Sequence, residues 1–496
     1  MVIRPTAEQA RIIQFSGSRL VVKARAGSGK TTTFFQIAQA YPRERMLYLA
    51  YSRAIRDAAA QRFPKRQVDC KTSHQLAFPK FGKLLRHKIS HHGNIPLREL
   101  ANALDTSNWA FVKDVLDVLT NFMCSADMKF YSDHFTRFNG KPNLTTKMVQ
   151  YQAEVVDAAE RVWVRMCDPD DPFPTVHDCY LKLYQLSMPD LSLQYKRILF
   201  DEAQDANPVT SQIVLSQSCK LTLVGDEHQQ IFRYRGAVNA LDHPLLNDVP
   251  RLYLTNSFRF GPNVAIVANA LLELKGETVP VVGRGQADTV TLHVPMGTEH
   301  RCLVSRTVMG VLESALAAAA RGESIFWVGG IENYKVQDLL DLHHFSRGEL
   351  GNVKNKKLKA DYKDYEEYKE AAEQTKDHEM QRSVRILETY AAEDIPAMID
   401  HLKSLTVEEE MEASITVTTA HRSKGLEWDT VQLTDDYPDI FDPDMEPEAR
   451  EDEINLLYVG SSRAMRVLII NAIIEIILNQ VAQRRRARAK IEMVTA

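Results

Sequence analysis

A glycine-rich stretch, ARAGSGKTTT (24–33), joins an apolar run to a helix-forming run. Gly27 and Gly29 let the backbone turn tightly, so that successive N–H groups can face the oxygens of a phosphate. The Lys30 ammonium can reach the β- and γ-phosphates, and the Thr31 hydroxyl is a ligand for Mg²⁺. The stretch predicts a nucleoside-triphosphate site, although the first glycine of the strict pattern is missing. A glycine-rich turn with a chance lysine is the alternative.

Two acidic residues follow a second apolar run, in the stretch ILFDEAQD (198–205). The Asp201 carboxylate suits a phosphate-bound Mg²⁺, and the Glu202 carboxylate can orient and deprotonate an attacking water. The pair alone is also typical of a helix N-terminus. A third run leads into LVGDEHQQIFRYRGA (223–237), where Gln229 can sense a γ-phosphate through a hydrogen bond. With the glycine-rich loop, these residues predict hydrolysis of a nucleoside triphosphate.

Aromatic and basic side chains alternate near the end of that third stretch. Phe232 and Tyr234 alternate with Arg233 and Arg235, a pattern that suits stacking of unpaired bases beside a cationic path. An amphipathic segment that packs its aromatic side chains inward is the alternative. This pattern predicts contacts with single-stranded nucleic acid.

Two further arginines stand in polar segments, Arg259 in TNSFRF (255–260) and Arg463 in YVGSSRA (458–464). An arginine that meets a γ-phosphate from another domain stabilises the charge of the transition state and makes hydrolysis depend on domain closure. Either arginine alone is more typical of a protein surface.

Strand-like apolar runs place these residues at their ends. MLYLA, QVDC, RILF, LTLV and RLYL each end in polar residues and alternate with helix-forming stretches, a pattern typical of parallel strands in an α/β sheet. Ligands bind at the carboxyl ends of such strands. A second set, TVTLHV, RCLVS, SIFWVGG, ITVTTA and RVLIINA, begins near residue 263. Residues 85 to 180 and 331 to 412 are helical in composition, and the second segment is highly charged, as is usual for a solvated helix face.

Composition bounds the class of protein. The chain has 496 residues, of which 44% are apolar, and is long enough for roughly two to four domains. Its net charge of −4 excludes a global basic field, so a nucleic-acid surface has to be a local groove. Scattered cysteines without a CxxC pair argue against a zinc or iron–sulfur centre and favour reduced thiols in a cytoplasmic protein. We expect no membrane segment, and the basic tail at 484–490 either touches phosphates or frays.

In chain order, these stretches resemble the motifs of the superfamily 1A DNA helicases of the UvrD/Rep/PcrA type, and most of all the F-box DNA helicase branch. TAEQ resembles the Q motif, ARAGSGKTT motif I, LAYSRAI motif Ia, CKTSHQLA motif Ib and FDEAQD motif II. GDEHQQIFRYRGA resembles motif III, SFRF motif IV, TTAHRSKGLEWDTVQL motif V and INLLYVGSSRA motif VI. LYLAYSRAI, CKT-x-H and KDHEMQRSVRILETY indicate the F-box branch. We find no F-box-like segment before the Q motif and expect no ubiquitin-ligase role to carry over.

The resemblance implies roles for individual residues. It implies ATP contacts by Gln9, Ala26, Gly27, Ser28, Gly29, Lys30, Thr31, Thr32, Arg235, Phe258 and Glu427, and Mg²⁺ contacts by Thr31 and Asp201. It implies a catalytic set of Lys30, Asp201, Glu202, Gln229, Arg259 and the arginine finger Arg463. It implies a DNA path over Tyr51, Arg53, Thr72, His74, Phe232, Tyr234, His421 and Lys424. The chain departs from the family motifs at Ser73, Tyr234 and Ser462.

We therefore expect an α/β fold with two RecA-like P-loop NTPase lobes, helical insertions, and ATP at the interface of the lobes. The expected division is lobe 1A at 1–85 and 176–260, helical insertion 1B at 86–175, lobe 2A at 261–330 and 413–496, and a reduced 2B-like insertion at 331–412. The span between motifs IV and V is too short for a full 2B subdomain.

The predicted activity is ATP-driven movement from 3′ to 5′ along single-stranded DNA, with unwinding of a tailed duplex, in DNA repair, recombination or replication. We expect the protein to act as a monomer and away from membranes. A DNA-stimulated ATPase that remodels protein–DNA complexes without unwinding is the first alternative, and a nucleotide-binding scaffold or small-molecule kinase is the second. The sequence leaves the pathway, the protein partners and the preference for DNA over RNA open.

Overall fold

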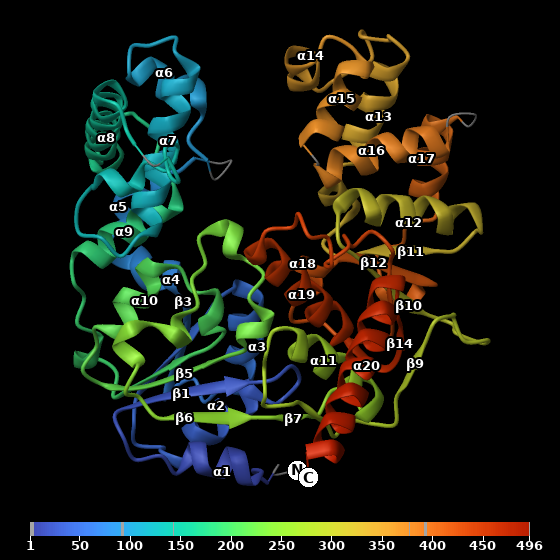
Figure 1. Cartoon of the computed structure of the whole chain (residues 1–496). Coiled ribbons are helices and arrows are strands. Elements are labelled where there is room, and N and C mark those ends of the chain that lie inside the picture. The colour runs from blue at the N-terminus through green and yellow to red at the C-terminus, as the bar shows by residue number, and fades with distance from the viewer. Residues whose placement is uncertain (1–3, 91–93, 142, 376, 391–393, 496) are drawn as a thin grey trace. The chain divides into compact units, whose positions relative to one another are not determined.

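The computed structural model describes residues 4–90, 94–141, 143–375, 377–390 and 394–495. The backbone divides into two compact units (Figure 1). The first unit holds Met1–Ala24 and Gly29–Leu254, and the second holds Arg25–Ser28 and Thr255–Ala496. Each unit is built on a parallel sheet of six strands, so the predicted α/β fold is confirmed.

The sheet of the first unit has the strand order β3-β2-β4-β5-β1-β6, and every neighbouring pair is parallel. The strands are β1 (Arg19–Ala24), β2 (Met46–Ala50), β3 (Val68–Thr72), β4 (Arg197–Phe200), β5 (Lys220–Gly225) and β6 (Arg251–Leu254). The five apolar runs predicted for this region are confirmed as strands. Because all six strands are parallel, their carboxyl ends share one edge of the sheet, where ligands bind in such folds.

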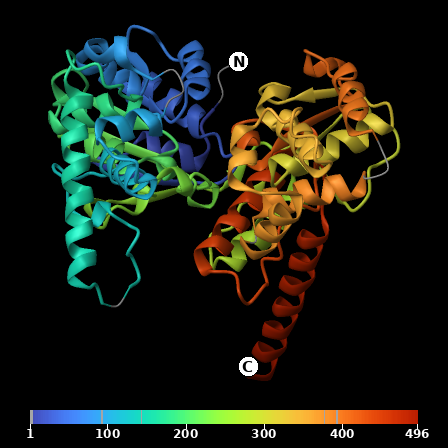
Figure 2. The same cartoon turned by 90° about the horizontal axis from the view of Figure 1, so that it is seen from above.

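The described helices of the first unit are α1 (Ala7–Ile13), α2 (Lys30–Ala40), α3 (Arg53–Arg62), α4 (Ser73–Ala77), α5 (Lys83–Leu85), α6 (Leu97–Ala103), α7 (Trp109–Cys124), α8 (Thr146–Cys167), α9 (His177–Leu186) and α10 (Pro208–Leu215). Helices α4 to α9 lie between β3 and β4, and α6, α7 and α8 pack side by side (Figure 1). Figure 2 shows α8 along its full length. The helical composition predicted for residues 85 to 180 is confirmed.

Both faces of this first sheet are covered, which is why its strands read as continuous apolar runs. Along β1, Val21 joins an apolar cluster on one face, whereas Leu20 and Val22 join a cluster on the other face with Phe34 and Ile37 of α2. Successive side chains of a strand point to opposite faces, so these two clusters fix how β1 sits in the sheet. The glycine-rich loop that follows β1 therefore starts from a rigid position.

The sheet of the second unit has the strand order β11-β12-β10-β13-β14-β9 and is also parallel throughout. The strands are β7 (Asn256–Ser257) and β8 (Val282–Gly283), which pair with each other, and β9 (Thr289–Thr291), β10 (Arg301–Ser305), β11 (Ile325–Trp327), β12 (Ile415–Thr419), β13 (Trp428–Leu433) and β14 (Ala464–Ile469). The five predicted runs are confirmed as strands. Strand β13 was not predicted, because the exposed Asp429 interrupts its apolar pattern.

The described helices of the second unit are α11 (Pro262–Leu274), α12 (Val308–Ala320), α13 (Val336–Ser346), α14 (Lys356–Asp361), α15 (Tyr365–Thr375), α16 (His378–Thr389), α17 (Ile395–Ser404), α18 (Ala420–Ser423), α19 (Pro447–Ser461) and α20 (Ala472–Thr495). Helices α13 to α17 lie between β11 and β12, so the helical composition predicted for this stretch is confirmed (Figure 1). One apolar cluster contains Leu312 of α12, Leu339 of α13, Ile386 of α16 and Ile399 of α17. The inserted helices thus share a core with α12.

Charged side chains fasten α16 to the first turn of α12. Glu379 accepts hydrogen bonds from the N–H groups of Val308 (2.8 Å) and Met309 (3.0 Å). Arg382, one turn further along α16, lies 2.5 Å from Glu313 of α12. A carboxylate at a helix N-terminus satisfies orphan donors and complements the helix dipole. Glu379 therefore caps a helix that is distant from it in sequence.

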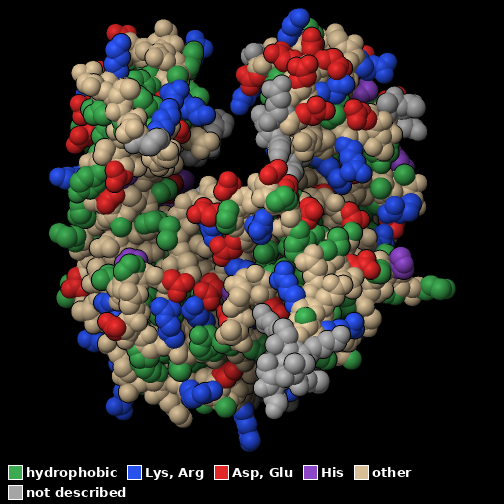
Figure 3. Space-filling view, viewed as in Figure 1, with side chains coloured by type: hydrophobic (Ala, Val, Ile, Leu, Met, Phe, Trp, Pro, Cys, Tyr) green, Lys and Arg blue, Asp and Glu red, His purple; other side chains and the backbone are tan. Residues whose placement is uncertain are grey.

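Acidic side chains gather in one part of the inserted helices, with basic side chains beside them, as Figure 3 shows. Asp361, Asp364, Glu366, Glu367 and Glu370 are all exposed, which agrees with a solvated helix face. Within the described residues, no helix is both long and apolar enough to cross a membrane. All six cysteines are unpaired thiols, in agreement with the reduced state expected from their spacing.

Replacement of Glu379 by alanine is expected to leave the N–H groups of Val308 and Met309 without this acceptor, although Thr307 still caps α12, and to lower the free energy of unfolding by about 1–2 kcal/mol. Urea unfolding followed by circular dichroism measures the change. Glu370→Ala, which removes an exposed carboxylate from the neighbouring α15, serves as the control and should leave the midpoint unchanged. Equal midpoints for the two variants would contradict the capping role.

Candidate nucleotide and nucleic-acid sites

The glycine-rich loop leaves the end of β1 and enters α2. Gly27 and Gly29 have φ angles of 70° and 80°, in the left-handed region that side chains disfavour, and Gly29 is the N-cap of α2. Lys30 and Thr31 are the first two residues of that helix, where backbone N–H groups attract anions. The local conformation suits a bound phosphate.

The Lys30 ammonium lies among carboxylates at the carboxyl edge of the first sheet. Its Nζ is 2.5 Å from Glu202 Oε1, and both side chains are mostly buried. Burial by itself lowers the pKa of Lys30, but the negative charges of Glu202, Asp201 and Asp226 outweigh burial, and the pKa is raised. Lys30 is therefore held in its charged form, as an interaction with phosphate oxygens requires.

Asp201 is a deeply buried carboxylate of this cluster and is 1% exposed. Burial and the charge of Glu202 raise the pKa of Asp201 to about 6, against the opposing effects of Lys30 and Tyr48. The Tyr48 hydroxyl donates to Asp201 Oδ2 at 2.6 Å, and the Glu202 N–H donates to Oδ1 at 2.9 Å. The Asp201 carboxylate is thus oriented by two donors, one on the neighbouring strand β2 and one on the residue that follows it.

The residues around Asp201 fit a Mg²⁺ ion. The Thr31 hydroxyl lies 3.5 Å from Asp201 Oδ2, so two hard oxygen donors face each other beside the first turn of α2. Hydroxyl and carboxylate oxygens are the protein ligands that Mg²⁺ takes when phosphates and water complete its shell. This donor set supports the pair of metal ligands expected from the sequence.

Glu202 adopts a backbone conformation that non-glycine residues rarely use, with φ 51° and ψ 42°. Its Oε2 accepts a hydrogen bond of 2.6 Å from Gln204 Nε2, while its Oε1 faces Lys30. Backbone strain of this kind costs roughly 1–3 kcal/mol and gathers at functional sites. Here it turns the carboxylate toward the glycine-rich loop.

Hydrogen bonds link Glu202 to the end of the next strand. Gln204 Oε1 accepts from the N–H of Asp226, which follows β5, at 3.1 Å. The buried Gln229 donates from Nε2 to Asp226 Oδ2 at 2.6 Å. The ends of β4 and β5 are therefore joined by a polar chain, and Gln229 stands at its far end.

Other predicted nucleotide contacts of the first unit surround α2. Gln9 forms a capping box with Thr6 and donates from Nε2 to Thr33 Oγ1 at 3.2 Å, which ties α1 to α2. The Thr32 hydroxyl accepts from Arg62 at 3.1 Å. These contacts hold the helix that follows the loop, and the roles of Gln9 toward adenine and of Thr32 toward phosphate stay predictions.

Within the second unit, residues 25–28 of the loop contact the motif IV and motif VI segments. The Ala26 N–H donates to the Tyr458 hydroxyl at 3.3 Å, and the Phe258 N–H donates to the Gly27 carbonyl at 2.9 Å. Ser28 is buried, whereas the Phe258 ring is 50% exposed and is open to a planar ligand. The expected stacking of Phe258 on adenine stays a prediction.

Arg259 links two of the motifs in the second unit. Its Nε lies 2.7 Å from Glu427 Oε2, and its Nη1 donates to the carbonyl oxygen of Ser462 at 3.1 Å. Glu427 is half-exposed at this ion pair. Motif IV, motif V and motif VI residues are therefore brought together by one guanidinium.

The predicted arginine finger, Arg463, is 1% exposed within the second unit. Its guanidinium donates to the carbonyl oxygens of Val459 (2.8 Å) and Leu426 (3.2 Å) and to the Ser462 hydroxyl (3.0 Å). These bonds fix the direction of the side chain, and its contact with a phosphate stays a prediction. The side chain of Arg235 lies outside the described residues.

Aromatic side chains that motifs Ia and III were expected to offer to DNA lie together in the first unit, and their contact with DNA stays a prediction. The rings of Tyr51 and Phe232 stack with their centroids 5.2 Å apart and their planes at 19°. Tyr234, whose ring is 6.4 Å from that of Phe232, is 67% exposed. Arg53 is exposed at the start of α3. Stacked rings beside a cation suit unpaired bases and their phosphates.

The motif Ib residues have different surroundings. Thr72 is buried and caps α4, because its hydroxyl accepts from the N–H of Gln75. His74 lies 3.0 Å from Asp178 of α9 and meets the ring of Tyr180 edge-on at 5.8 Å. The Thr72 hydroxyl thus has a structural partner, whereas His74 belongs to a polar cluster with α9. Contact of either residue with DNA stays a prediction.

Of the predicted DNA contacts of the second unit, His421 lies within the short helix α18, which follows β12, and Lys424 is its C-cap. Both side chains are half-buried. Thr419 caps α18 by accepting from the N–H of Arg422, which fixes this turn at the carboxyl edge of the sheet. That position is the one where parallel sheets bind ligands.

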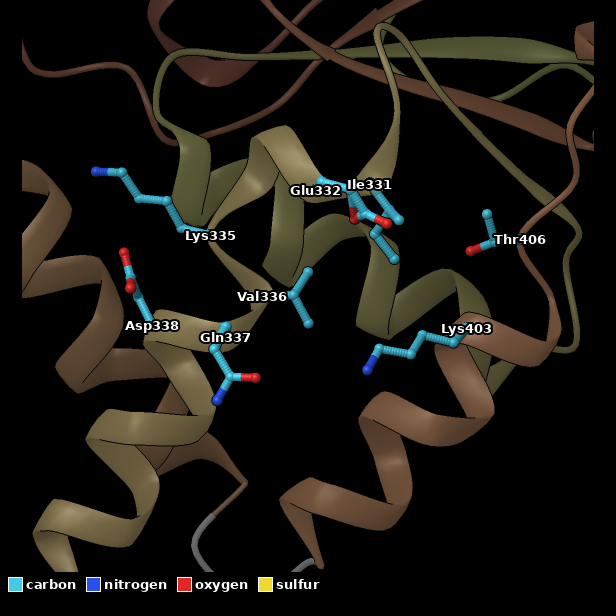
Figure 4. Close-up of a pocket in the computed structure, with 8 residues that line it drawn as sticks. All are labelled: Ile331, Glu332, Lys335, Val336, Gln337, Asp338, Lys403 and Thr406. Carbon is cyan, nitrogen blue, oxygen red and sulfur yellow. The ribbon is translucent and has the colours of Figure 1, made fainter. Parts of the chain in front are cut away.

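The second unit also has a cavity of about 700 Å³ between the start of α13 and the end of α17 (Figure 4). Its lining includes Glu332, Lys335, Gln337, Asp338 and Lys403. Figure 4 shows that Lys335 and Asp338 are directed to one side, away from Lys403. Acidic and basic groups are thus mixed, and no residue predicted to bind nucleotide or DNA lines the cavity.

Comparison with protein families agrees with the motifs. Residues 173–243 match the UvrD/REP helicase N-terminal domain, and residues 331–475 match the UvrD-like helicase C-terminal domain. The chain belongs to the UvrD/Rep-type superfamily 1 helicases, in which two RecA-like lobes carry the motifs.

Curated relatives point to the F-box branch of that family. The chain is 32% identical to F-box DNA helicase 1 of Gallus gallus, over 96% of this chain and 50% of the relative. It is 28% identical to F-box DNA helicase protein 1 of Schizosaccharomyces pombe, over 94% of this chain and 57% of the relative. A shorter match, 34% identical over 19% of this chain and 16% of the relative, is to a probable DNA helicase II homolog of Mycoplasma genitalium. The chain spans about half the length of the first two relatives.

Three residues of the nucleotide site were not predicted from the sequence. Tyr48 lies within an apolar strand and gave no polar signal, although its hydroxyl contacts Asp201. Gln204 lies in motif II and Asp226 in motif III. In these motifs, catalytic roles were predicted only for Asp201, Glu202 and Gln229. The polar residue that ends each strand of a parallel sheet was the available signal, and it applies to Asp226.

Replacement of Tyr48 by phenylalanine is expected to remove one donor from the buried Asp201 and to weaken its hold on Mg²⁺. A hydrogen bond to a charged group contributes about 1.5–3 kcal/mol, so the Mg²⁺ concentration for half-maximal ATP hydrolysis should rise roughly ten-fold. Tyr41→Phe loses a comparable bond, to the Ile13 carbonyl, and should leave the Mg²⁺ requirement unchanged. The same Mg²⁺ requirement in both variants would contradict the role of Tyr48.

Proposed function

We propose that the chain is an ATP-driven DNA motor that moves from 3′ to 5′ along single-stranded DNA and unwinds a tailed duplex. The buried group of Lys30, Asp201 and Glu202 at the end of a parallel sheet supports the ATPase half of this proposal. The stacked rings of Tyr51 and Phe232 support the DNA half. The F-box DNA helicases that the chain resembles over nearly its whole length support the pairing of the two.

Lys30 and Glu202 neutralise each other in the structure, and this pairing suggests how ATP starts the cycle. Phosphate oxygens that enter the loop compete with Glu202 for the Lys30 ammonium. Glu202, once released from Lys30 and still held by Gln204, is free to orient a water and to accept its proton. Thr31 and Asp201 would hold a Mg²⁺ ion, which would supply charge neutralisation for the phosphates.

The second unit supplies the groups that sense the γ-phosphate in this proposal. Arg259 and Arg463, together with Arg235 of the first unit, stabilise the charge that develops as the γ-phosphate leaves. Release of that phosphate reverses these contacts. A DNA strand whose bases stack alternately on Phe232 and Tyr234 then advances with each round of hydrolysis.

A second candidate function is a DNA-stimulated ATPase that remodels protein–DNA complexes without unwinding. The inserted helices favour it, because they share one apolar core with α12 and are fastened to it by Glu379. An insertion fixed in this way offers a rigid face for a bound protein. The cellular process, whether repair, recombination or replication, follows from neither candidate.

Lys30→Ala is expected to abolish ATP hydrolysis, because the loop loses the cation that meets the phosphates. Glu202→Gln is expected to bind ATP but to hydrolyse it at least about 100-fold more slowly, because the amide cannot take a proton. Phosphate release and binding of a fluorescent ATP analogue measure the two effects. Lys65→Ala, at an exposed lysine of the same unit, is the control.

Wild-type hydrolysis by Lys30→Ala would show that the site is misassigned. Loss of nucleotide binding by Glu202→Gln would show that Glu202 holds the structure together rather than activating water.

Strand-displacement assays on 3′-tailed and 5′-tailed duplexes separate the two candidate functions. The proposed motor is expected to unwind the 3′-tailed duplex in an ATP-dependent reaction and to leave the 5′-tailed duplex intact. ATP hydrolysis that is stimulated by single strands without displacement from either duplex would support the remodelling ATPase instead.

A further inference from the structure

A buried lysine donates hydrogen bonds to the backbone of one loop of the first unit. This tethered loop, residues 125–131, follows the last residue of α7. Lys182 of α9 is fully buried and donates from Nζ to the carbonyl oxygens of Ser125 (2.9 Å) and Asp127 (2.5 Å). Burial lowers the pKa of Lys182 to about 8, which shows that the fold places this ammonium there at a cost. The hydrogen bonds to the loop carbonyl oxygens offset this cost.

A histidine and a glutamine fix the rest of the tethered loop. The Nδ1 of the buried His134 accepts from the Tyr131 N–H at 2.9 Å, and its Nε2 lies 3.1 Å from Asp127 Oδ2. Gln185 donates to the carbonyl oxygen of Ala126 at 3.1 Å. Side chains from α9 and from the turn after the loop thus hold it at both ends, so that its conformation is set before any ligand binds.

The tethered loop directs its large side chains in opposite directions. Phe130 stacks on Phe122 of α7 with the centroids 3.9 Å apart and anchors the loop. Met128 and Tyr131 are 49% and 44% exposed. The ammonium of the exposed Lys129 lies 5.3 Å from the centroid of the Tyr131 ring. A rigid piece of chain therefore presents an aromatic ring with a cation over it to solvent.

The tethered loop begins beside the motif III segment. A Cβ added to Gly236 would lie 3.6 Å from the Cβ of Cys124, which directly precedes the loop. Gly236 follows Tyr234 by two residues, and Tyr234 is 67% exposed. Both segments belong to the first unit. The start of the loop therefore lies beside the segment that carries Phe232 and Tyr234.

We propose that the tethered loop extends the single-strand path of the first unit, with Tyr131 as a platform for an unpaired base and Lys129 as the contact to the adjoining phosphate. Lys182 is a positioning residue that holds the platform in place. This inference rests on the proposed DNA-dependent function and adds a binding site to it.

The chemistry of the loop favours a nucleotide over a protein side chain as its occupant. A ring and a cation side by side match the two parts of a nucleotide, its base and its phosphate. The acidic residue within the loop, Asp127, is engaged by His134, and the exposed Asp133 accepts from the Ser132 hydroxyl. A loop that is already ordered loses little entropy on binding, which strengthens binding to a flexible strand.

Fluorescence anisotropy with a labelled single-stranded oligonucleotide tests the ring. Tyr131→Ala is expected to bind roughly ten-fold more weakly than the wild type, and Tyr131→Phe to bind like the wild type, because stacking needs only the ring. Trp109→Ala is the matched control, since Trp109 is a 56% exposed aromatic at the opposite end of α7. It should bind like the wild type.

The salt dependence of the same binding tests the lysine. Lys129→Gln is expected to lower the slope of log affinity against log salt by about 0.7, the value for one lost phosphate contact on a single strand. Lys141, which lies 5.1 Å from the Phe138 ring, forms a similar pair elsewhere in this helical region. Lys141→Gln should leave the slope unchanged.

Variants of two buried lysines distinguish a role of Lys182 in positioning the loop from a general role in stability. Lys182→Met is expected to lower single-strand affinity several-fold and to speed amide exchange within the tethered loop. Lys88→Met removes a comparable cap, from the carbonyl oxygens of Arg165, Asp168 and Asp171, and should cost stability without changing affinity. Equal losses of affinity in the two variants would overturn the positioning role of Lys182.

The wild-type measurement distinguishes failure of this site from failure of the proposed function. If the wild type binds no single strand, both inferences fall. If the wild type binds and Tyr131→Ala matches it, only the tethered loop is excluded, and its surface is left to a protein partner. Equal weakening by Tyr131→Ala and Trp109→Ala would likewise overturn the site.

Discussion

The ion pair between Lys30 and Glu202, set against the buried Asp201, is the interaction on which the rest of the first unit depends. Loss of one partner from a buried pair costs about 3–5 kcal/mol, because an uncompensated charge remains in the interior. The sheet makes the pair possible. Its strand order puts β4, whose end leads directly into both carboxylates, between β2, which carries Tyr48, and β5, whose end leads into Asp226. The buried Lys30 ammonium is costly to hold without a partner, and we expect it to leave Glu202 for the phosphates when ATP binds.

Both helical insertions use one physical device to become rigid. In the first unit the buried Lys182 donates to carbonyl oxygens of the tethered loop, and in the second unit Glu379 accepts from N–H groups at the start of α12. Each is a charged side chain that satisfies backbone groups far away in the sequence. Buried backbone groups without a hydrogen-bond partner cost free energy, so these contacts stabilise the fold. Segments that differ in length and surface charge are thereby fixed to α9 in the first unit and to α12 in the second.

Much of the fold and part of the site could be predicted from the sequence. Apolar runs that end in polar residues predicted the strands, because a buried parallel strand must be apolar throughout. The glycine-rich loop predicted Lys30 and Thr31 at a helix start, because glycine is needed at positive φ. Tyr48 could not be predicted, since only the strand order brings its hydroxyl to Asp201. Nor did the sequence indicate that the Thr72 hydroxyl would cap α4, because a threonine in motif Ib gives the same signal for a cap and for a DNA contact.

ATP hydrolysis by the purified chain, alone and with single-stranded DNA, single-stranded RNA or blunt duplex, tests the central claim most directly. If the carboxylate cluster and the stacking surface belong to one motor, hydrolysis is slow without nucleic acid and rises strongly with single-stranded DNA. A rate that no nucleic acid changes would contradict the account and would leave the site as that of an ATPase under other control.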